Sequence, residues 1–309
     1  MTRVLLTGAS GFIGRRLLDH LRRAGVDVTV VGRNAIAHAD VTCHTVATLD
    51  AEHLASLPAH LSFDAVIHLA AAGVHPSDRD MDRLVQVNGH LPADLLRFAQ
   101  QRGARAFVMT GSNAEYAAAG QQNVAEDSPL ESLKAYGATK AAGAILAVAA
   151  GVAAGITAVN LRLFNVFGPG EAPHRLLPSL VSRLERGEAV PLSEGTQLRD
   201  FIHVDDACRA VVTALDATLT GVLTSGHYNV CSGTGTSVRD FALAVAAAVG
   251  SDAAALHFGE LPMRPDDLPR VVGDPEKFAS VTGWRPHTSV ERAIELAVIE
   301  MRTESKPES

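Results

Sequence analysis

The stretch TGASGFIG, residues 7–14, decides the fold. It follows a short apolar run and opens a helical pattern, with glycines at Gly8, Gly11 and Gly14. In this setting the first glycine permits a tight turn, the second lets the backbone approach a pyrophosphate, and the third lets the helix pack on the sheet. The helix N-terminus then offers free N–H groups to phosphates. A plain glycine-rich turn could share the spacing, but the preceding strand and following helix indicate dinucleotide binding.

Strand and helix patterns alternate through the first half of the chain. The expected strands are Val4–Thr7, Val28–Val31, Ala65–Leu69, Ala106–Thr110 and Thr157–Leu163. The expected helices lie near 12–24, 50–57, 78–102 and 135–153. This alternation predicts an α/β fold with a doubly wound parallel sheet, the Rossmann arrangement. Gly89 and Pro92 predict a kink or a late start in the third helix.

The pattern changes after Phe164, where GPGEAP (168–173) clusters glycine and proline. Two helical patterns follow, at 176–186 and 238–249. We expect residues 1–168 to form the dinucleotide-binding Rossmann domain. We expect residues 169–309 to form mainly a smaller C-terminal substrate-binding cap, with a segment near 200–230 returning to the Rossmann sheet.

Composition excludes several classes of protein. The formal net charge of −7 disfavours a nucleic-acid partner. Three well-separated cysteines suit a reducing compartment and make neither a disulfide framework nor a zinc pattern. The apolar stretch 141–154 falls short of the roughly 20 residues that cross a membrane. We therefore expect a cytoplasmic protein without a membrane partner.

The thirteen histidines form no H-E-x-x-H motif or close cluster with cysteine, so no catalytic metal is expected. His68 and His203 lie in apolar strand-like runs, which favours satisfied core positions. His75 and His174 lie in loops near the predicted cleft and are weaker candidates for substrate contacts.

The segment AYGATK (135–140) places Tyr136 and Lys140 four residues apart, on one face of a helix. A free tyrosine has a pKa of about 10, and a neighbouring ammonium favours the phenolate and lowers that pKa. Such a pair can exchange a proton with a carbinol oxygen. Ser112, in MTGSNAEY (109–116), follows a strand at the sheet edge where such folds place their ligands. A surface tyrosine and a serine in a loop cap are the alternatives.

These motifs resemble the extended branch of the short-chain dehydrogenase/reductase superfamily. Its TGxxGFIG turn matches 7–14, and the spacing from Ser112 to Tyr116 is that of its catalytic segment. VIHLAA (66–71), LRLFNVFGPG (161–170), RDFIHVDD (199–206), YNVCSGTGTS (228–237) and the region 264–286 are similar to further family segments, so the resemblance covers nearly the whole chain.

The resemblance implies roles for individual residues. Catalysis would use Ser112, Tyr136 and Lys140. The coenzyme would contact Gly8, Ser10, Gly11, Phe12, Ile13, Gly14, Leu69, Ala70 and Ala71, together with Tyr136 and Lys140. The substrate, a nucleotide-diphosphate sugar, would contact Ser112 and Asn165, with Arg199 and Arg264 on the diphosphate. Glu115 is a weaker candidate for a sugar contact. A surface ion pair, with Asp200 adjacent, is the alternative for Arg199.

The end of the second strand, VVGRN (30–34), bears on the coenzyme. A carboxylate at this point binds the ribose hydroxyls of NAD and repels a 2′-phosphate. Gly32, Arg33 and Asn34 remove the repulsion and add a cation, so they predict NADP(H). An arginine that stacks on adenine without a 2′ preference is the alternative. The aspartate with which many family members hold adenine has no clear counterpart in 46–50.

The expected reaction follows from these departures. In the dehydratases of the family an Asp–Glu pair follows the catalytic residue, and here Asn113 and Ala114 stand there. The chain most resembles the reductases of GDP-4-keto-6-deoxymannose and related 4-ketoreductases of dTDP-deoxysugars. We therefore expect NADPH-dependent reduction at C4 of a nucleotide-linked 4-keto-6-deoxyhexose. A 4-epimerase with tightly bound NAD is the main alternative, and a non-catalytic NADP-sensing regulator is a more distant one. Helices near 84–102 and 136–153 resemble those that pair in family dimers, so a homodimer is expected.

Overall fold

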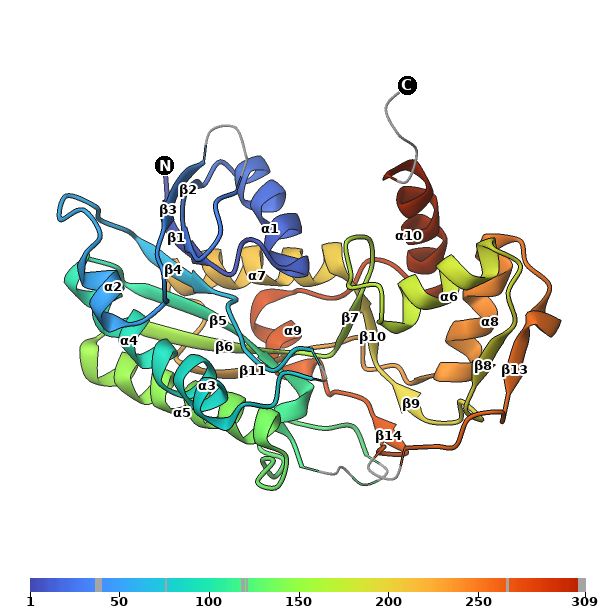
Figure 1. The fold of residues 1–309 in the computed structure, drawn as a ribbon. Helices are drawn as coiled ribbons and strands as arrows, with labels where there is room; N and C mark the ends of the chain where they lie inside the picture. The colour runs from blue at the N-terminus through green and yellow to red at the C-terminus, as the bar shows by residue number, and fades with distance from the viewer. Residues whose placement is uncertain (37–40, 76, 118–119, 121, 265–266, 305–309) are drawn as a thin grey trace.

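A computed structural model describes residues 1–36, 41–75, 77–117, 120, 122–264 and 267–304. Its centre is a sheet of seven strands, all paired in parallel. Their order is β11 (Gly226–Val230), β6 (Thr157–Leu163), β5 (Ala106–Ser112), β4 (Ala65–His68), β1 (Arg3–Thr7), β2 (Asp27–Gly32) and β3 (Thr42–Thr45). The predicted doubly wound α/β fold is confirmed (Figure 1).

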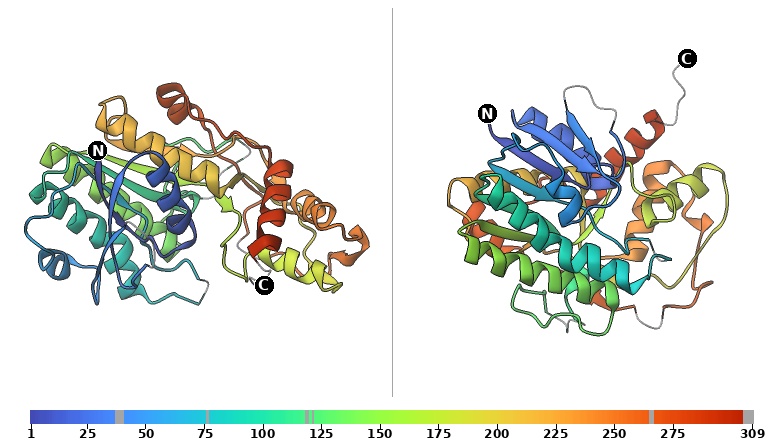
Figure 2. Two further views of the ribbon diagram at one scale, coloured as in Figure 1. Left: turned by 90° about the horizontal axis from the view of Figure 1, so that it is seen from above. Right: turned by 60° about the vertical axis from the view of Figure 1, so that its left-hand side comes forward.

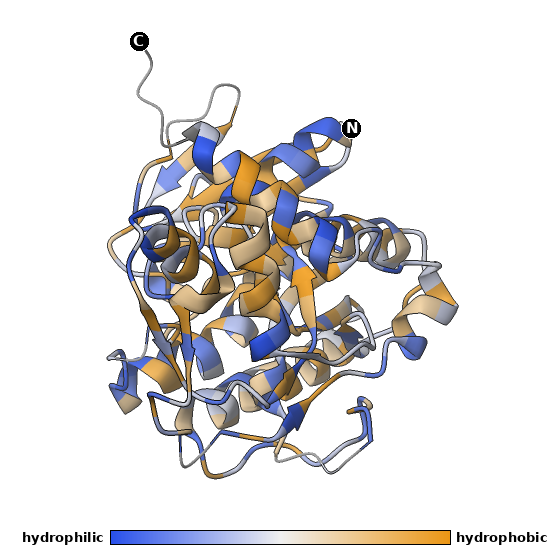
Figure 3. Ribbon diagram, turned by 90° about the vertical axis from the view of Figure 1, so that its right-hand side faces the viewer, coloured by the Kyte–Doolittle hydropathy of each residue, from blue (hydrophilic) through white to orange (hydrophobic). Residues whose placement is uncertain are grey.

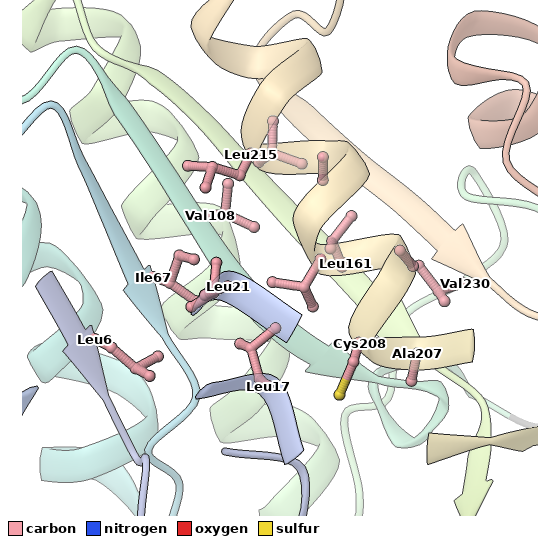
Figure 4. Packing of buried hydrophobic residues seen from close by; sticks show 14 of the residues in the cluster. Leu6, Leu17, Leu21, Ile67, Val108, Leu161, Ala207, Cys208, Leu215 and Val230 are labelled. Carbon is pink, nitrogen blue, oxygen red and sulfur yellow. The ribbon is translucent and has the colours of Figure 1, made fainter. Parts of the chain in front are cut away.

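Helices cover both faces of this sheet, which explains why its strands are apolar throughout rather than alternating. One face packs on α1 (Phe12–Arg23) and α7 (Val204–Leu219), and Figure 4 shows Leu17 and Leu215 of these helices against Val108 and Leu161 of the sheet. The other face packs on α2 (Ala51–Ala55), α4 (Leu91–Gln101) and α5 (Ala135–Ala154). The result is a three-layer Rossmann domain.

The strand order reverses between β1 and β4, and a ligand crevice is expected at that point. The loops after the two strands touch there: a Cβ on Gly8 would lie 2.5 Å from the Ala70 nitrogen. Gly8 also has a φ of +78°, which glycine adopts at little cost. At Gly14 a Cβ would lie 2.2 Å from the Gly8 carbonyl oxygen, so glycine is what lets α1 start this close to the turn.

The third expected helix, near 78–102, is divided into three parts. They are α3 (Met81–Leu84), a π-helical turn η1 (Val85–His90) and α4. Pro92 has no N–H to offer the carbonyl four residues earlier, that of Asn88, which frees this carbonyl from α-helical bonding. A Cβ on Gly143 of α5 would lie 1.8 Å from that same carbonyl oxygen. The expected kink is therefore a wider turn against which α5 packs closely.

The cap has its own core, built by α6 (Leu176–Glu185), α8 (Val238–Val249), α10 (Val290–Glu304) and β8 (Val190–Leu192) with β13 (Leu256–Phe258). Two small sheets join it to the Rossmann domain: β7 (Asn165–Phe167) pairs with β10 (Phe201–His203), and β9 (Leu198–Arg199) lies between β12 (Thr236–Ser237) and β14 (Arg270–Val271). Short elements complete the chain, namely η2 (Asn113–Glu115), η3 (Ala253–Ala255) and α9 (Glu276–Thr282).

The chain crosses between the two parts more than once. After β10 it runs back along α7 to β11 at the edge of the large sheet, and then returns to the cap through β12 and α8. The two views of Figure 2 show α7 lying over the sheet while α6, α8 and α10 gather at the other end. Neither α7 nor α10 was predicted from the sequence.

One helix, α5, is long and apolar enough to cross a membrane by length and composition alone, and 44% of its apolar window is buried. Its buried residues are mostly alanines and glycines that pack against α4, η1 and the sheet. Figure 3 shows the wider pattern, in which hydrophobic residues concentrate toward the inside of the molecule. The apolar character of α5 accords with a helix that carries Tyr136 and Lys140 on a Rossmann core.

Candidate active site

A groove of about 390 Å³ lies where the ends of β1, β2 and β4 meet the start of α1. It brings together every non-catalytic residue predicted to contact the coenzyme: Gly8, Ser10, Gly11, Phe12, Ile13, Gly14, Arg33, Asn34, Leu69, Ala70 and Ala71. The helix α1 begins at Gly11 without a side-chain cap, so its first N–H groups suit phosphate oxygens. The groove therefore fits a nicotinamide dinucleotide.

Arg33 and Asn34 stand at the exposed end of the groove, directly after β2. No carboxylate belongs to the described lining of this groove. Asp50, the acid in the segment 46–50 discussed above for adenine, caps α2 by accepting from the His53 N–H at 3.0 Å. Its neighbour Leu49 lines the groove instead, so the adenine end of the site is apolar.

A second cavity of about 260 Å³ continues from the groove and contains Ser112, Tyr136, Lys140 and Asn165. Thr110 lines both spaces, as do Phe12 and Leu69 among other residues. The catalytic residues come from different elements: Ser112 ends β5, whereas Tyr136 and Lys140 lie in the first turns of α5. The three residues predicted to act together are thus brought to one cavity, beside the coenzyme groove.

Tyr136 is hydrogen-bonded to the Ser112 side chain, which lowers the pKa of the phenol. Burial has the opposite and larger effect, and Glu115 adds to it, so the pKa of Tyr136 lies above its ordinary value. The sequence predicted a lowered pKa through Lys140. In the structure the ammonium of Lys140 donates to the Thr110 carbonyl at 2.7 Å, and burial lowers the lysine pKa. Tyr136 is therefore a neutral phenol in this arrangement.

Glu115, a candidate for a sugar contact, faces the interior instead. Its carboxylate is fully buried and pairs with Arg162 of β6 at 2.8 Å. It also accepts from the backbone N–H of Ser112 at 2.9 Å, while the Ser112 hydroxyl accepts from the Ala114 N–H. This reciprocal capping box closes η2. The prediction of a sugar contact for Glu115 is wrong because the carboxylate serves the turn beneath the cavity.

The predicted substrate residues surround two further spaces next to the catalytic cavity. One of about 260 Å³ is lined by Asn165, Arg199 and Arg264, and another of about 460 Å³ by Tyr136 with the same two arginines. Arg199 forms an ion pair with Asp267, not with the adjacent Asp200. The position of the two arginines suits a diphosphate, which would replace Asp267 as the partner of the Arg199 guanidinium.

Asp200 is not the surface ion-pair partner that was considered for Arg199. It is buried and accepts from Ser232, from the Gly233 N–H at 2.9 Å and from the Gly273 N–H at 3.2 Å. Burial raises its pKa to about 6, against the lowering effect of these hydrogen bonds. Asn165 donates to the Asp200 carbonyl at 3.1 Å, so this residue ties the substrate side of the cavity to the cap.

The histidines discussed from the sequence lie in two environments. His68 is buried and its Nδ1 lies 2.7 Å from the Thr7 hydroxyl, as expected for a satisfied core position. His203 is buried and its Nδ1 caps α7, accepting from the Asp205 N–H at 3.3 Å, but its Nε2 is buried without a partner, so the prediction of a satisfied core histidine is wrong for this nitrogen. His174 lines the catalytic cavity and meets His75 edge-on, with 4.6 Å between ring centroids. Among the residues that the structure describes, no group of three metal-ligating side chains occurs.

Thr110 and Asn88 are among the site residues that were missed from the sequence. Thr110 joins the coenzyme groove to the catalytic cavity and anchors Lys140, and its place two residues before Ser112 at a strand end could have indicated it. Asn88 holds the loop after β4: its side chain accepts from the Ala72 N–H at 2.9 Å and donates to the Ala72 carbonyl at 3.1 Å. No local pattern indicated Asn88, because it lies in the unexpected π-helical turn.

A dinucleotide groove that opens on a Ser–Tyr–Lys cavity is typical of the short-chain dehydrogenase/reductases, and the family match places the chain in the extended branch. The chain belongs to the NAD dependent epimerase/dehydratase family, whose profile matches residues 4–231. It is 30% identical to a dTDP-glucose 4,6-dehydratase of Streptomyces griseus over 84% of this chain and 82% of the relative.

Solved structures agree with this assignment. MoeE5 in complex with UDP-glucuronic acid and NAD is 29% identical, with 98% and 99% of the two chains covered and a TM-score of 0.83. The UDP-glucose 4-epimerase of Thermus thermophilus, in complex with NAD, is also 29% identical, with 97% and 99% covered and a TM-score of 0.83. These similarities support a nicotinamide dinucleotide as the coenzyme and leave the reaction within the family open.

Proposed function

We propose that this protein is an NADPH-dependent reductase of the C4 keto group of a nucleotide-linked 4-keto-6-deoxyhexose. The nucleotide-sugar part rests on the family and on relatives whose names and complexes contain dTDP-glucose, UDP-glucose and UDP-glucuronic acid. The choice of reduction rests on one observation above all. Arg33 and Asn34 end the coenzyme groove where a carboxylate would select NAD. NADPH is a coenzyme that reductases consume.

Two features of the catalytic cavity favour the same direction. Tyr136 is held as a neutral phenol by burial and by the nearby Glu115 carboxylate, and reduction needs a proton donor at this place. Asn113 and Ala114 follow Ser112 and line the neighbouring space, so the two positions expected to carry a dehydratase's acids hold an amide and a methyl group. Neither side chain can act as a general acid or base at neutral pH.

The chain's residues would divide the chemistry as follows. Bound NADPH supplies the hydride that C4 receives. Ser112 donates its hydroxyl proton in a hydrogen bond to the C4 oxygen and stabilises the charge that develops there. Tyr136 gives its proton to that oxygen. Lys140, fixed at the Thr110 carbonyl, places a cation one turn from Tyr136 and stabilises the phenolate that remains.

The decisive experiment offers NADPH and a panel of NDP-4-keto-6-deoxyhexoses to the purified protein, follows the loss of reduced nicotinamide and identifies the product. Oxidation of NADPH with formation of the 4-hydroxy sugar is the expected result. Turnover with NADH but not NADPH would contradict the coenzyme part. The absence of turnover across the panel would instead favour a non-catalytic NADP-sensing protein.

A 4-epimerase with tightly bound NAD is the second candidate, because a UDP-glucose 4-epimerase is among the similar solved structures. The coenzyme that purifies with the protein separates the two. An epimerase would retain NAD through purification and interconvert UDP-glucose and UDP-galactose without added coenzyme. A reductase would purify largely free of coenzyme, or with NADP.

We further propose a homodimer formed through α5 and the helices beside it. Ile145, Leu146 and Val152 are exposed large apolar side chains on α5, and Met81 and Val85 are exposed on the neighbouring segment. Such a face is suited to burial against a second copy. Light scattering coupled to gel filtration should give twice the chain mass, and Leu146→Glu should give the mass of one chain.

A further inference from the structure

The turn that carries Ser112 rests on a buried ion pair. The Glu115 side chain has 0% and the Arg162 side chain 1% of its surface exposed. One Glu115 oxygen accepts from the Ser112 N–H at 2.9 Å, and the other accepts from Arg162 Nε at 2.8 Å and from Asn160 Nδ2 at 3.0 Å. Burying two charges is costly unless they are paired and hydrogen-bonded, and both Glu115 oxygens and the Arg162 guanidinium have such partners here. Neither Glu115 nor Arg162 lines the coenzyme groove or the cavities beside it, so the pair needs another explanation.

The fold makes room for this carboxylate at a particular point. A Cβ on Gly111 would lie 2.2 Å from a Glu115 carboxylate oxygen and 2.6 Å from Asn160 Oδ1. On the other side, a Cβ on Gly137 would lie 2.0 Å from the Ala114 carbonyl oxygen, so the first turn of α5 is seated directly on η2. The Ser112 turn is therefore held between the Glu115 carboxylate below and the Tyr136 helix above.

The Arg162 guanidinium continues the arrangement into the rest of the protein. It donates to the Tyr116 hydroxyl at 2.9 Å and to the Glu126 carbonyl at 3.0 Å, and Tyr116 donates to Asn229 of β11 at 2.6 Å. The ion pair of Glu115 thus lies on the side away from the cavity. On the cavity side, the Glu115 charge raises the pKa of Tyr136 and opposes the lowering of the Lys140 pKa by burial.

We propose that Glu115 is a positioning residue: its carboxylate, held by Arg162, fixes the Ser112 backbone so that the Ser112 hydroxyl meets the Tyr136 phenol, and it sets a negative charge beneath the turn that this phenol contacts. The use of this charge in proton donation rests on the proposed reductive function. The first half of this inference holds for any reaction that uses Ser112 and Tyr136.

The charged groups around the two side chains define what a test must separate. Two charged residues near Tyr136 are Lys140 on the same helix and Glu115 on η2. Two more, Arg79 and Arg175, come from segments on either side of the cavity. Glu115 faces Arg162 and, across the turn, Tyr136 and Lys140. His227 lies beyond Asn160, at 3.3 Å from its side-chain nitrogen. Of the residues that the structure describes, only Glu115 combines a charge near Tyr136 with a hydrogen bond to the Ser112 backbone, so charge and geometry can be changed one at a time.

The test compares Glu115→Asp with Glu115→Gln. Glu115→Asp keeps the charge but shortens the reach to the Ser112 N–H, so kcat should fall about tenfold or more with the phenol titration unchanged. Glu115→Gln keeps the reach but leaves Arg162 as an unbalanced cation, so the Tyr136 phenol should titrate about one pH unit lower or more. The alkaline fall of kcat should move by the same amount, and the KM for the coenzyme should stay as in the parent in both variants.

The phenol titration is measured by ultraviolet difference spectroscopy, with the same changes in a Tyr136→Phe background to subtract Tyr116 and Tyr228. This measurement needs no substrate. An absent shift in Glu115→Gln would therefore overturn the inference even if the proposed reaction were confirmed. A shift without turnover on any keto sugar would keep the inference and refute the proposed function.

Two further variants guard against trivial effects. Val298→Ala, in the buried part of α10, should lower stability without changing the pH dependence of kcat. If Glu115→Gln does not fold, Glu115→Gln combined with Arg162→Gln removes both buried charges, a replacement that proteins often tolerate. This double variant should titrate close to the parent; the same shift as in the single variant would show that charge balance is not the cause.

Discussion

The polar residues at the sheet end and those in the cap are held in different ways. At the ends of β1, β4, β5 and β6 the polar pairs are buried: Thr7 with His68, Thr110 with Lys140, and Glu115 with Arg162. In the cap, Arg199 is paired but partly exposed and Arg264 is exposed. The chemistry is therefore assembled before a substrate arrives, while the residues proposed to recognise the substrate can exchange partners. A change at the sheet end should affect kcat, and a change in the cap should affect KM.

The largest effect is expected at the sheet end. Tyr136→Phe removes the proton donor and should lower kcat by about 10²–10⁴-fold. Coenzyme affinity, measured by nicotinamide fluorescence, should stay within a factor of about two, because the phenyl ring keeps the packing. If kcat stayed near that of the parent, the phenol would not be the donor and the division between the two regions would fail.

The substrate side should respond through KM. Arg264→Ala removes a cation from two of the spaces beside the catalytic cavity. KM for the nucleotide sugar should rise about 10–100-fold with kcat within a few-fold of the parent, the pattern of lost uniform binding. Arg285→Ala, on the exposed surface near α9, serves as the matched control and should leave both constants unchanged. If kcat fell as much as KM rose, Arg264 would belong with the buried catalytic residues at the sheet end and not with the cap.

A smaller effect is expected at the coenzyme. Arg33→Ala should weaken NADPH about tenfold or more, through loss of the cation beside the 2′-phosphate, and should change NADH affinity little. Titration of the apoprotein with each coenzyme checks this. Equal losses for the two coenzymes would mean that Arg33 stacks on adenine and carries no 2′ preference.

The last prediction concerns stability and not catalysis. Burial lowers the pKa of His68 from 6.5 to about 3, so the unfolded chain binds a proton between these values that the folded protein does not. Stability should fall as pH drops from 6.5 toward 3, with His68 contributing up to about 1.4 kcal/mol per pH unit. Urea unfolding across this window should give a shallower dependence for His68→Gln. An unchanged slope would mean that His68 is protonated in the fold and that the sheet end is wetter than described.

Much of the Rossmann domain could be predicted because its signals are local. The glycines of 7–14 and the apolar runs of β1, β2, β4, β5 and β6 identify the fold from consecutive residues. The short edge strand β3 escaped prediction because Thr42–Thr45 offers little apolar pattern. The helix α7 was not predicted because its start lies within a segment that was interpreted as a family signature. The π-helical turn was not predicted because its sequence is typical of an ordinary α-helix.

The candidate site was predictable only in part, for the same reason. Ser112, Tyr136 and Lys140 are recognised by their spacing along the chain, and the structure brings them together. The partners of the charged residues cannot be recognised by spacing, because they are far apart in the sequence. Arg162 lies 47 residues from Glu115, and Asp267 lies 68 residues from Arg199. Burial also reversed the expected pKa shift of Tyr136, since desolvation of the phenol and the Glu115 charge outweigh the lowering by the Ser112 hydrogen bond and the nearby arginines.

The crossing of the chain between the two parts limits how its specificity could be re-engineered. The cap is supplied by one stretch before α7 and another after β11, and β9 of the first is sandwiched between β12 and β14 of the second. A chimaera that imported a new sugar preference from a relative would have to transplant both stretches at once. Asp200 in the first stretch accepts hydrogen bonds from Ser232, Gly233 and Gly273 in the second. A chimaera would have to preserve these bonds to fold.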